Sequence, residues 1–166
     1  MRSSALRAFV AVACAFAVVL ATAAVASADA PTREPVVLSD TTLPADICGF
    51  PIDVTFLVTN QTMTTFSDGR ILITGALEVR LTSQTTSIVL NVSGPTTITP
   101  NGDGTFTIKS GGRSVFFFFP GELAAGSPGA FLLTTGLATE QVTATFAPIP
   151  GTFAANRAED LCAVLA

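Results

Sequence analysis

Four consecutive phenylalanines, Phe116–Phe119, place the strongest constraint on how this chain can fold. In a β-strand successive side chains point to opposite faces, so Phe116 and Phe118 would share one face and the other two rings the opposite face. Each ring offers roughly 150–250 Å² of apolar surface, whereas the largest apolar patch on a typical monomer is about 300–600 Å². At least one face must therefore be covered, and we expect a central strand with a further layer on each side.

The first 28 residues have the pattern of a secretory signal peptide. Arg2 and Arg7 give a positive start, residues 8–25 are almost uninterruptedly apolar, and Ala26-Ser27-Ala28 has the small residues of a cleavage site. We expect cleavage after residue 28 and a secreted, extracellular protein without a membrane span. The alternative is an uncleaved membrane anchor, because the apolar run approaches the length that crosses a bilayer.

Removal of this signal would leave an acidic chain. Residues 29–166 contain 6 basic and 12 acidic residues, and the basic residues form no cluster. This balance argues against nucleic acid as a partner and against docking on anionic lipid. The partners that remain open are a small apolar molecule and a partner at the cell surface.

Several residue types that carry chemistry are missing from the sequence. The chain has no His, Trp or Tyr. The absence of His removes the usual general base near neutral pH and the commonest metal ligand. We therefore expect neither a cofactor nor a metal ion, and no Ser-His pair is possible.

Two cysteines remain after residue 28, Cys48 and Cys162. In an exported protein an even pair of cysteines predicts a disulfide, which would join the start of the domain to its end. Closing a loop of about 100 residues stabilises a fold by roughly 4–5 kcal/mol in the loop-entropy model. The alternative is two free, buried thiols.

Alternating apolar residues predict about eight or nine strands in one all-β, antiparallel meander. An Asp-Gly hairpin signal at residues 68–69 separates the strands expected at 52–66 from a long strand at 71–82, in which Gly75 indicates a bend or bulge. Shorter strands are expected between residues 87 and 147, and residues 156–165 have the apolar spacing of a short C-terminal helix. We expect an extended leader at 29–47, with a weak edge strand at 36–38, and a single domain at 48–166. A closed barrel is favoured over a two-layer sandwich.

Several short motifs resemble those of a group of small exported proteins of actinobacteria. The motifs are Cys48-Gly49-Phe50-Pro51, Asp68-Gly69-Arg70, Gly112-Arg113 with the phenylalanine run, residues 128–132 and residues 160–163. The resemblance implies export and a shared fold, and it brings no activity, cofactor or catalytic residue. The expected architecture is also similar to allene oxide cyclase-like barrels, but a shared fold does not fix function.

Two carboxylates are speculative catalytic candidates. Glu78 lies two residues from Arg80 on the polar face of a predicted strand, and Asp53 lies on the polar face of the first strand. Inside a cavity such a carboxylate could transfer protons or hold a polar ligand. The favoured alternative is a solvated outer face, since polar residues at every second position are typical of a sheet that meets water.

Two hypotheses for function follow. The favoured one is a non-catalytic exported barrel with a structural or interaction role, or a carrier of a small apolar ligand lined by Phe116 and Phe118. The alternative is a barrel enzyme of the cyclase or isomerase type that uses Glu78 or Asp53 as acid or base. The favoured interpretation of the phenylalanines themselves is core packing under the C-terminal helix.

Overall fold

The computed structural model describes residues 29–166, and the expected signal peptide lies outside the described residues. The fold is all-β with antiparallel strands and two short helices, as predicted. The strands form a nine-stranded sheet and a three-stranded sheet. Within residues 29–166, no helix is long and apolar enough to cross a membrane.

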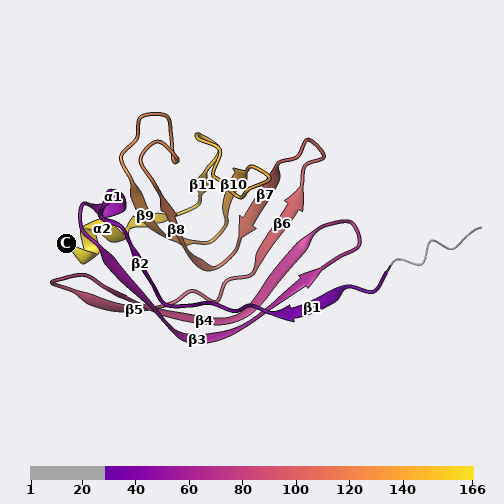
Figure 1. The fold of residues 1–166 in the computed structure, drawn as a ribbon, viewed down its shortest axis with the longest axis horizontal. Helices are drawn as coiled ribbons and strands as arrows, with labels where there is room; N and C mark the ends of the chain where they lie inside the picture. Colours follow the sequence, from indigo (N-terminus) through magenta and orange to yellow (C-terminus); the bar gives the residue numbers. More distant parts are fainter. Residues whose placement is uncertain (1–28) are drawn as a thin grey trace, which may run out of the picture.

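A long hairpin forms the base of the molecule (Figure 1). Strands β3 (Ile52–Thr65) and β4 (Ile71–Thr82) pair along their whole length, and the turn between them contains the predicted Asp-Gly pair with Gly69 at φ 81°. The two strands expected over 52–66 are therefore one. A bulge between Phe56 and Val58 breaks the register of β3. Such a bulge bends a strand and increases its twist.

Shorter strands extend both edges of this hairpin. Along β3 lie β1 (Thr32–Pro35) and β2 (Thr41–Leu43); along β4 lie β5 (Ser87–Asn91) and β6 (Thr96–Pro100). The edge strand predicted at 36–38 is wrong, because these residues form the connection between β1 and β2. Leu43 and Ile47, which follow in the segment expected as a leader, are buried in the main core.

The chain then departs from the simple meander. Strand β7 (Phe106–Ser110) pairs with β6 and with β10 (Ala138–Val142), while β8 (Arg113–Phe118) and β9 (Ala130–Thr135) form a hairpin in the second sheet. Strand β11 (Ala154–Ala155) pairs with β10, and β12 (Ala158–Asp160) pairs with β9. Strand β8 is thus an edge strand, and its predicted central position is wrong.

Two neighbouring connections, from β9 to β10 and from β11 to β12, bend together and join the two sheets. The backbone passes from β9 to β10 through Gly136, which has φ 90°, and from β11 to β12 through residues 156–157. At this corner the Asn156 N–H donates to Leu137 O at 2.9 Å, and the Thr135 N–H donates to Arg157 O at 3.0 Å. The hydrogen-bond ladder therefore continues around the bend, as where strands switch from one sheet to another.

Both helices lie together at one end of the molecule (Figure 1). Helix α1 spans Ala45–Cys48 and helix α2 spans Leu161–Leu165. The helix predicted over 156–165 is wrong in its first half, since residues 158–160 pair with β9. The Asp160 side chain accepts a hydrogen bond from the Cys162 N–H at 2.8 Å and so caps the start of α2.

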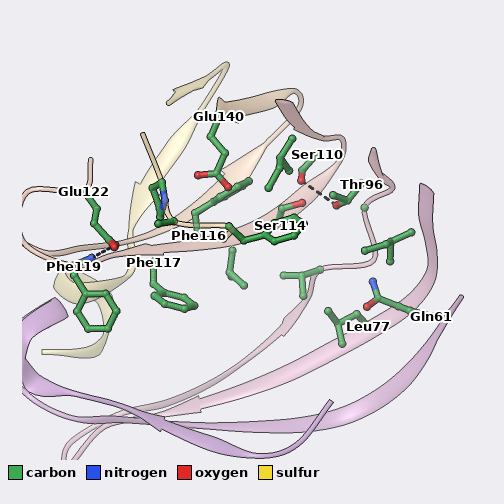
Figure 2. Close-up of a pocket in the computed structure, with 18 of the residues that line it drawn as sticks. Gln61, Leu77, Thr96, Ser110, Ser114, Phe116, Phe117, Phe119, Glu122 and Glu140 are labelled. Atoms are coloured by element: carbon green, nitrogen blue, oxygen red, sulfur yellow. Dashed lines mark hydrogen bonds between the residues drawn. The ribbon is translucent and has the colours of Figure 1, made fainter. Parts of the chain in front are cut away.

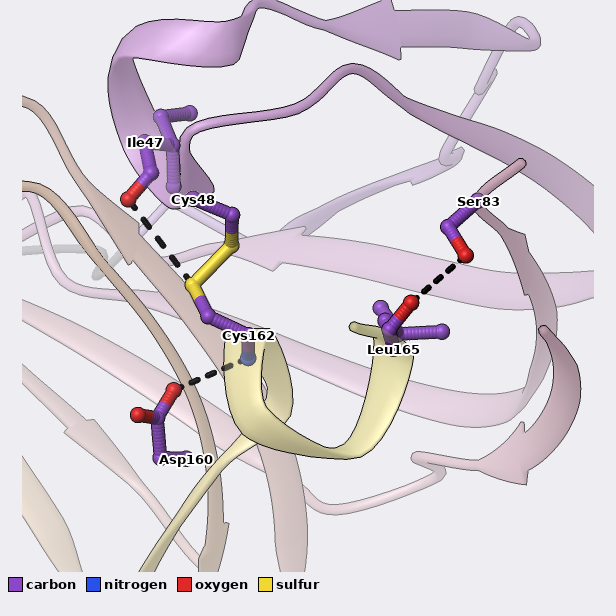
Figure 3. Close-up of a disulfide and its surroundings, with 6 residues drawn as sticks. All are labelled: Ile47, Cys48, Ser83, Asp160, Cys162 and Leu165. Atoms are coloured by element: carbon purple, nitrogen blue, oxygen red, sulfur yellow. Dashed lines mark hydrogen bonds between the residues drawn. A yellow bond between two sulfur atoms is a disulfide. The ribbon is translucent and has the colours of Figure 1, made fainter. Parts of the chain in front are cut away.

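A disulfide between Cys48 and Cys162 joins the two helices, with a Cα–Cα distance of 5.2 Å, as predicted (Figure 3). Leu161 and Leu165 of α2 are buried in the main core with Ile52, Leu81 and other residues of the long hairpin. The Ser83 hydroxyl donates to Leu165 O at 2.6 Å and fixes the end of α2 to the turn after β4. The end of the chain is thus held by a covalent bond, by packing and by a hydrogen bond.

Candidate functional site

A cleft of about 530 Å³ lies between the concave side of the long hairpin and the strands above it (Figure 2). Its lower wall contains Gln61 of β3 and Ile73 and Leu77 of β4. These residues share a face because Gln61 pairs with Gly75, which lies between the two apolar positions of β4. The cleft thus forms where the bent hairpin turns away from the rest of the molecule.

The lower wall depends on close approach of the two backbones at Gly75. This glycine has φ 129°, and a Cβ atom there would collide with the carbonyl oxygen of Asn60. Only glycine adopts such a conformation readily. Gly75 itself is in regular register with Gln61 at positive φ, and the bulge of this hairpin lies further along β3, between Phe56 and Val58, opposite Val79 and Glu78.

Three of the four adjacent phenylalanines line the upper side of the cleft. The Phe117 and Phe119 rings point down toward the long hairpin (Figure 2) and lie edge to face, with 6.2 Å between their centroids. Phe117 remains 48% exposed and Phe119 37% exposed. The protein therefore keeps two large apolar rings in contact with water at this cleft, and Phe146 adds a third exposed ring to the lining.

The opposite face of β8 is covered, although not by the expected element. Phe116 is 9% exposed and Phe118 1% exposed, and both rings pack edge to face against Phe153, at centroid distances of 5.3 and 5.1 Å. The cover thus comes from the segment before β11, with Ala138 of β10 in the same cluster. The predicted cover by the C-terminal helix is wrong, since α2 packs on the main core instead. Phe118 is packed in this cluster and does not line the cleft, whereas Phe116 lines it as well.

A buried carboxyl group, Glu140 of β10, lies in the wall of the cleft (Figure 2). Its side chain is 9% exposed. Among residues 29–166, the one ion pair is Arg70–Asp68, and no hydrogen bond reaches the Glu140 carboxyl. Burial, followed by the nearby charge of Glu122, raises the pKa of Glu140 from 4.5 to about 7.

Among the described residues that line the cleft around Glu140, none carries a positive charge that would offset its burial. Its partner across the ladder, Ile108 of β7, is apolar, and Lys109 is exposed on the other face of that strand. The second charged group of the lining, Glu122, comes from the loop after β8 and accepts a hydrogen bond from the Phe119 N–H at 2.7 Å. The cleft therefore combines apolar rings with negative charge.

The carboxylates singled out from the sequence lie elsewhere. Asp53 is exposed and accepts a hydrogen bond from the Thr42 hydroxyl at 2.6 Å, which ties β2 to β3. Glu78 is half-buried in β4, in register with Val58 and Asn91. Neither residue lines the cleft. The structure therefore does not bring these two candidates into the cleft.

The sequence contains a signal for Glu140 that alternation and motif spacing alone do not bring out. Glu140 falls in the same alternating series as Ala138 and Val142, which are both buried. A carboxyl group at an inward position of a strand is unusual, because burying an unpaired charge is costly. Strands are expected as far as residue 147, but β10 ends at Val142, and Ala144 and Phe146, which would have continued this alternating series, are exposed.

In the part of the chain that the structure describes, no three Cys, Asp or Glu side chains are grouped closely enough to hold a metal ion. The cleft offers apolar contact and two carboxyl groups, those of Glu122 and Glu140, from residues far apart in the sequence. Comparison of the chain with family models, with curated proteins and with solved structures found no match.

Proposed function

We propose that this protein is an exported, non-catalytic carrier that binds a small, largely apolar molecule in the cleft under β8. The observation that carries the proposal is the pair of half-exposed rings, Phe117 and Phe119, that point into a cleft of about 530 Å³. Ligand sites are clefts of roughly 300–1,000 Å³ lined mainly by apolar and aromatic side chains. A bound molecule would cover these rings, and each Å² of apolar surface removed from water would contribute about 25 cal/mol of favourable free energy.

A titration with the neutral lipophilic dye N-phenyl-1-naphthylamine tests this proposal. We expect saturable binding with enhanced dye fluorescence in the wild-type protein and weaker binding by Phe117→Ala. Leu137→Ala is the matched control, because Leu137 is also 48% exposed but lies outside the cleft lining. Absence of saturable binding, or equal loss in both variants, would count against a carrier.

Export is part of the proposal and has a separate test. The signal pattern of residues 1–28 and the disulfide that joins Cys48 to Cys162 support it, because disulfides persist in oxidising compartments. The intact mass of the protein recovered from culture medium should match a chain that begins at Asp29 with its two cysteines oxidised. A product that stays with the membrane and retains residues 1–28 would support the anchor instead.

We also propose that the two sheets act as walls of one closed barrel around the cleft. The continuous hydrogen bonding around the bend at Gly136 supports this arrangement over two separate layers. The sheet pairings leave β1 and β8 as edge strands, so full closure requires their outer edges to pair and predicts slow hydrogen exchange at the amides there. Fast exchange at both edges would favour a two-layer sandwich, in which these edges stay open.

A second candidate function, an enzyme of the cyclase or isomerase type, would use Glu140. A carboxyl group with a pKa of about 7 in an apolar cleft is suited to proton transfer near neutral pH. This function predicts that a molecule captured by the wild-type protein is recovered as an isomer with a new chromatographic retention. Recovery of the unchanged molecule from both the wild type and Glu140→Gln would favour the carrier.

A further inference from the structure

We propose that the cleft selects hydrophobic organic cations, with the apolar body of the ligand against the phenylalanine rings and its ammonium group at the Glu140 carboxylate. This inference rests on the proposed function, because it names the ligand class for the same cleft. It draws on the charges of the lining, the unpaired state of Glu140 and the chemistry of the rings.

The first argument is charge complementarity. Of the described residues that line the cleft, two are charged, and both are acidic: Glu122 and Glu140. A fatty acid or another organic anion would place its charge beside two carboxylates and would be repelled. A cation would be attracted by both groups, most strongly in the partly dehydrated interior, where charge interactions are least screened.

The second argument is that Glu140 lacks a partner. Glu140 is 9% exposed, faces the cleft, and receives no hydrogen bond or ion pair from residues 29–166. Its carboxyl oxygens meet only the water of the cleft, because no fully buried side-chain oxygen of these residues lacks a partner. A buried carboxylate is normally paired, because removing it from water without compensation is costly. A ligand ammonium group would supply the missing counter-charge and hydrogen-bond donor.

The third argument concerns the size and hydration of the cation. An inorganic ion such as Ca²⁺ takes 6–8 oxygen ligands, and the cleft offers two carboxylates, one of which already accepts the Phe119 N–H. An alkylammonium ion instead presents methyl or methylene groups to apolar walls. Aromatic faces attract such ions, and aromatic cages are the known sites for quaternary ammonium groups.

A displacement series at pH 8, where Glu140 is mostly ionised, tests the inference. Its three ligands share a phenyl ring on a short alkyl chain and differ in the charge of the end group. The probes are 4-phenylbutylammonium, which carries N–H donors and is protonated at pH 8, 4-phenylbutanol and 4-phenylbutanoate, each competing with N-phenyl-1-naphthylamine. We expect the cation to displace the dye at a concentration about tenfold below that of the alcohol, and the anion to be weakest. Lowering the pH to 5 protonates Glu140 and should reduce the preference for the cation.

The variant Glu140→Gln removes the charge and keeps the shape of the side chain. It should lose most of the difference between cation and alcohol, whereas Glu78→Gln, outside the cleft, should behave as the wild type. If the dye binds but the three probes compete equally, or the anion competes best, the ligand class is wrong and the carrier function stands. If neither dye nor probes bind, the carrier function fails and this inference fails with it. If Glu140→Gln does not fold, the wild type alone tests the inference. A preference for the cation that is the same at pH 8 and at pH 5 would overturn it.

Discussion

Phe116 and Phe117 are neighbours in β8, yet Phe116 is 9% exposed and Phe117 is 48% exposed. Phe116 and Phe118 pack in one cluster with Phe153, whereas Phe117 and Phe119 point into the cleft. Because side chains alternate between the two faces of a strand, one pair of these four phenylalanines stabilises the fold and the other pair faces the cleft, where it would bind a ligand. The predictions below separate these two roles.

Truncation of the buried face should unfold the protein more easily than truncation of the open face. We expect Phe118→Ala to lower the free energy of unfolding by about 3–5 kcal/mol, because Phe118 is 1% exposed and its removal leaves a cavity. Phe117→Ala should lower it by less than about 1 kcal/mol. Urea denaturation followed by circular dichroism measures both, and equal losses would show that the two faces are not distinct.

The Glu140 carboxyl should make stability depend on pH. Its pKa is about 7 in the folded protein and 4.5 in the unfolded chain, so folding takes up a proton between these values. The free energy of unfolding therefore decreases as pH rises through this window. Relative to Glu140→Gln, we expect the wild type to be equally stable below pH 4.5 and less stable by about 2–3 kcal/mol above pH 7, since the full pKa shift corresponds to at most about 3.4 kcal/mol and contact of the carboxyl with water in the cleft reduces it. Urea midpoints of both proteins at pH 4.5 and pH 8 measure this, and a constant difference would show that Glu140 titrates normally.

Reduction of the disulfide should release the end of the chain. Cys48 and Cys162 are 114 residues apart in sequence, so the disulfide closes a long loop in the unfolded state. We expect its loss to cost roughly 2–5 kcal/mol of unfolding free energy. Denaturation with and without a reductant measures this cost, and the double variant Cys48→Ser, Cys162→Ser serves as a control that should not respond to the reductant. Unchanged wild-type stability on reduction would contradict the role given to this bond.

Gly75, which lies between Ile73 and Leu77 in the lower wall of the cleft, should be hard to replace. Gly75→Ala should destabilise the protein by on the order of 2–4 kcal/mol, since the new Cβ meets Asn60 O in the paired strand. Gly102→Ala is the matched control, because Gly102 also has positive φ but has open space around its Cβ position, and it should cost about 1 kcal/mol. Thermal unfolding of the two variants compares them, and similar losses would mean that the close approach at Gly75 is unimportant.

Much of the sheet could be predicted from alternation and turn residues alone. The Asp-Gly turn, the strand at 71–82 and the pairing of Cys48 with Cys162 follow from local signals and from counting. Which strand neighbours which could not be predicted. Nothing local to β8 shows that its hairpin with β9 leaves the first sheet, or that β10 returns to β7, because these pairings depend on contacts between distant segments.

The cleft could not be predicted from the sequence for the same reason. Its walls come from β3, β4, β6, β7, β8 and β10, and only the fold brings them together. The sequence drew attention to Glu78 and Asp53 because both stand beside other polar residues in alternating strands. Glu140 stands among apolar inward positions, and this conflict with the strand pattern was the more informative signal.

The central claim, that the cleft holds an apolar ligand, is tested most directly by methyl NMR of the protein titrated with N-phenyl-1-naphthylamine. The account predicts shift changes at the cleft methyls of Ile73, Leu77, Val92 and Ile108, and none at Leu161 and Leu165 of the main core. Changes confined to Leu57, Val58 and Val89, which are exposed and lie outside the cleft lining, would place the ligand elsewhere and contradict the account.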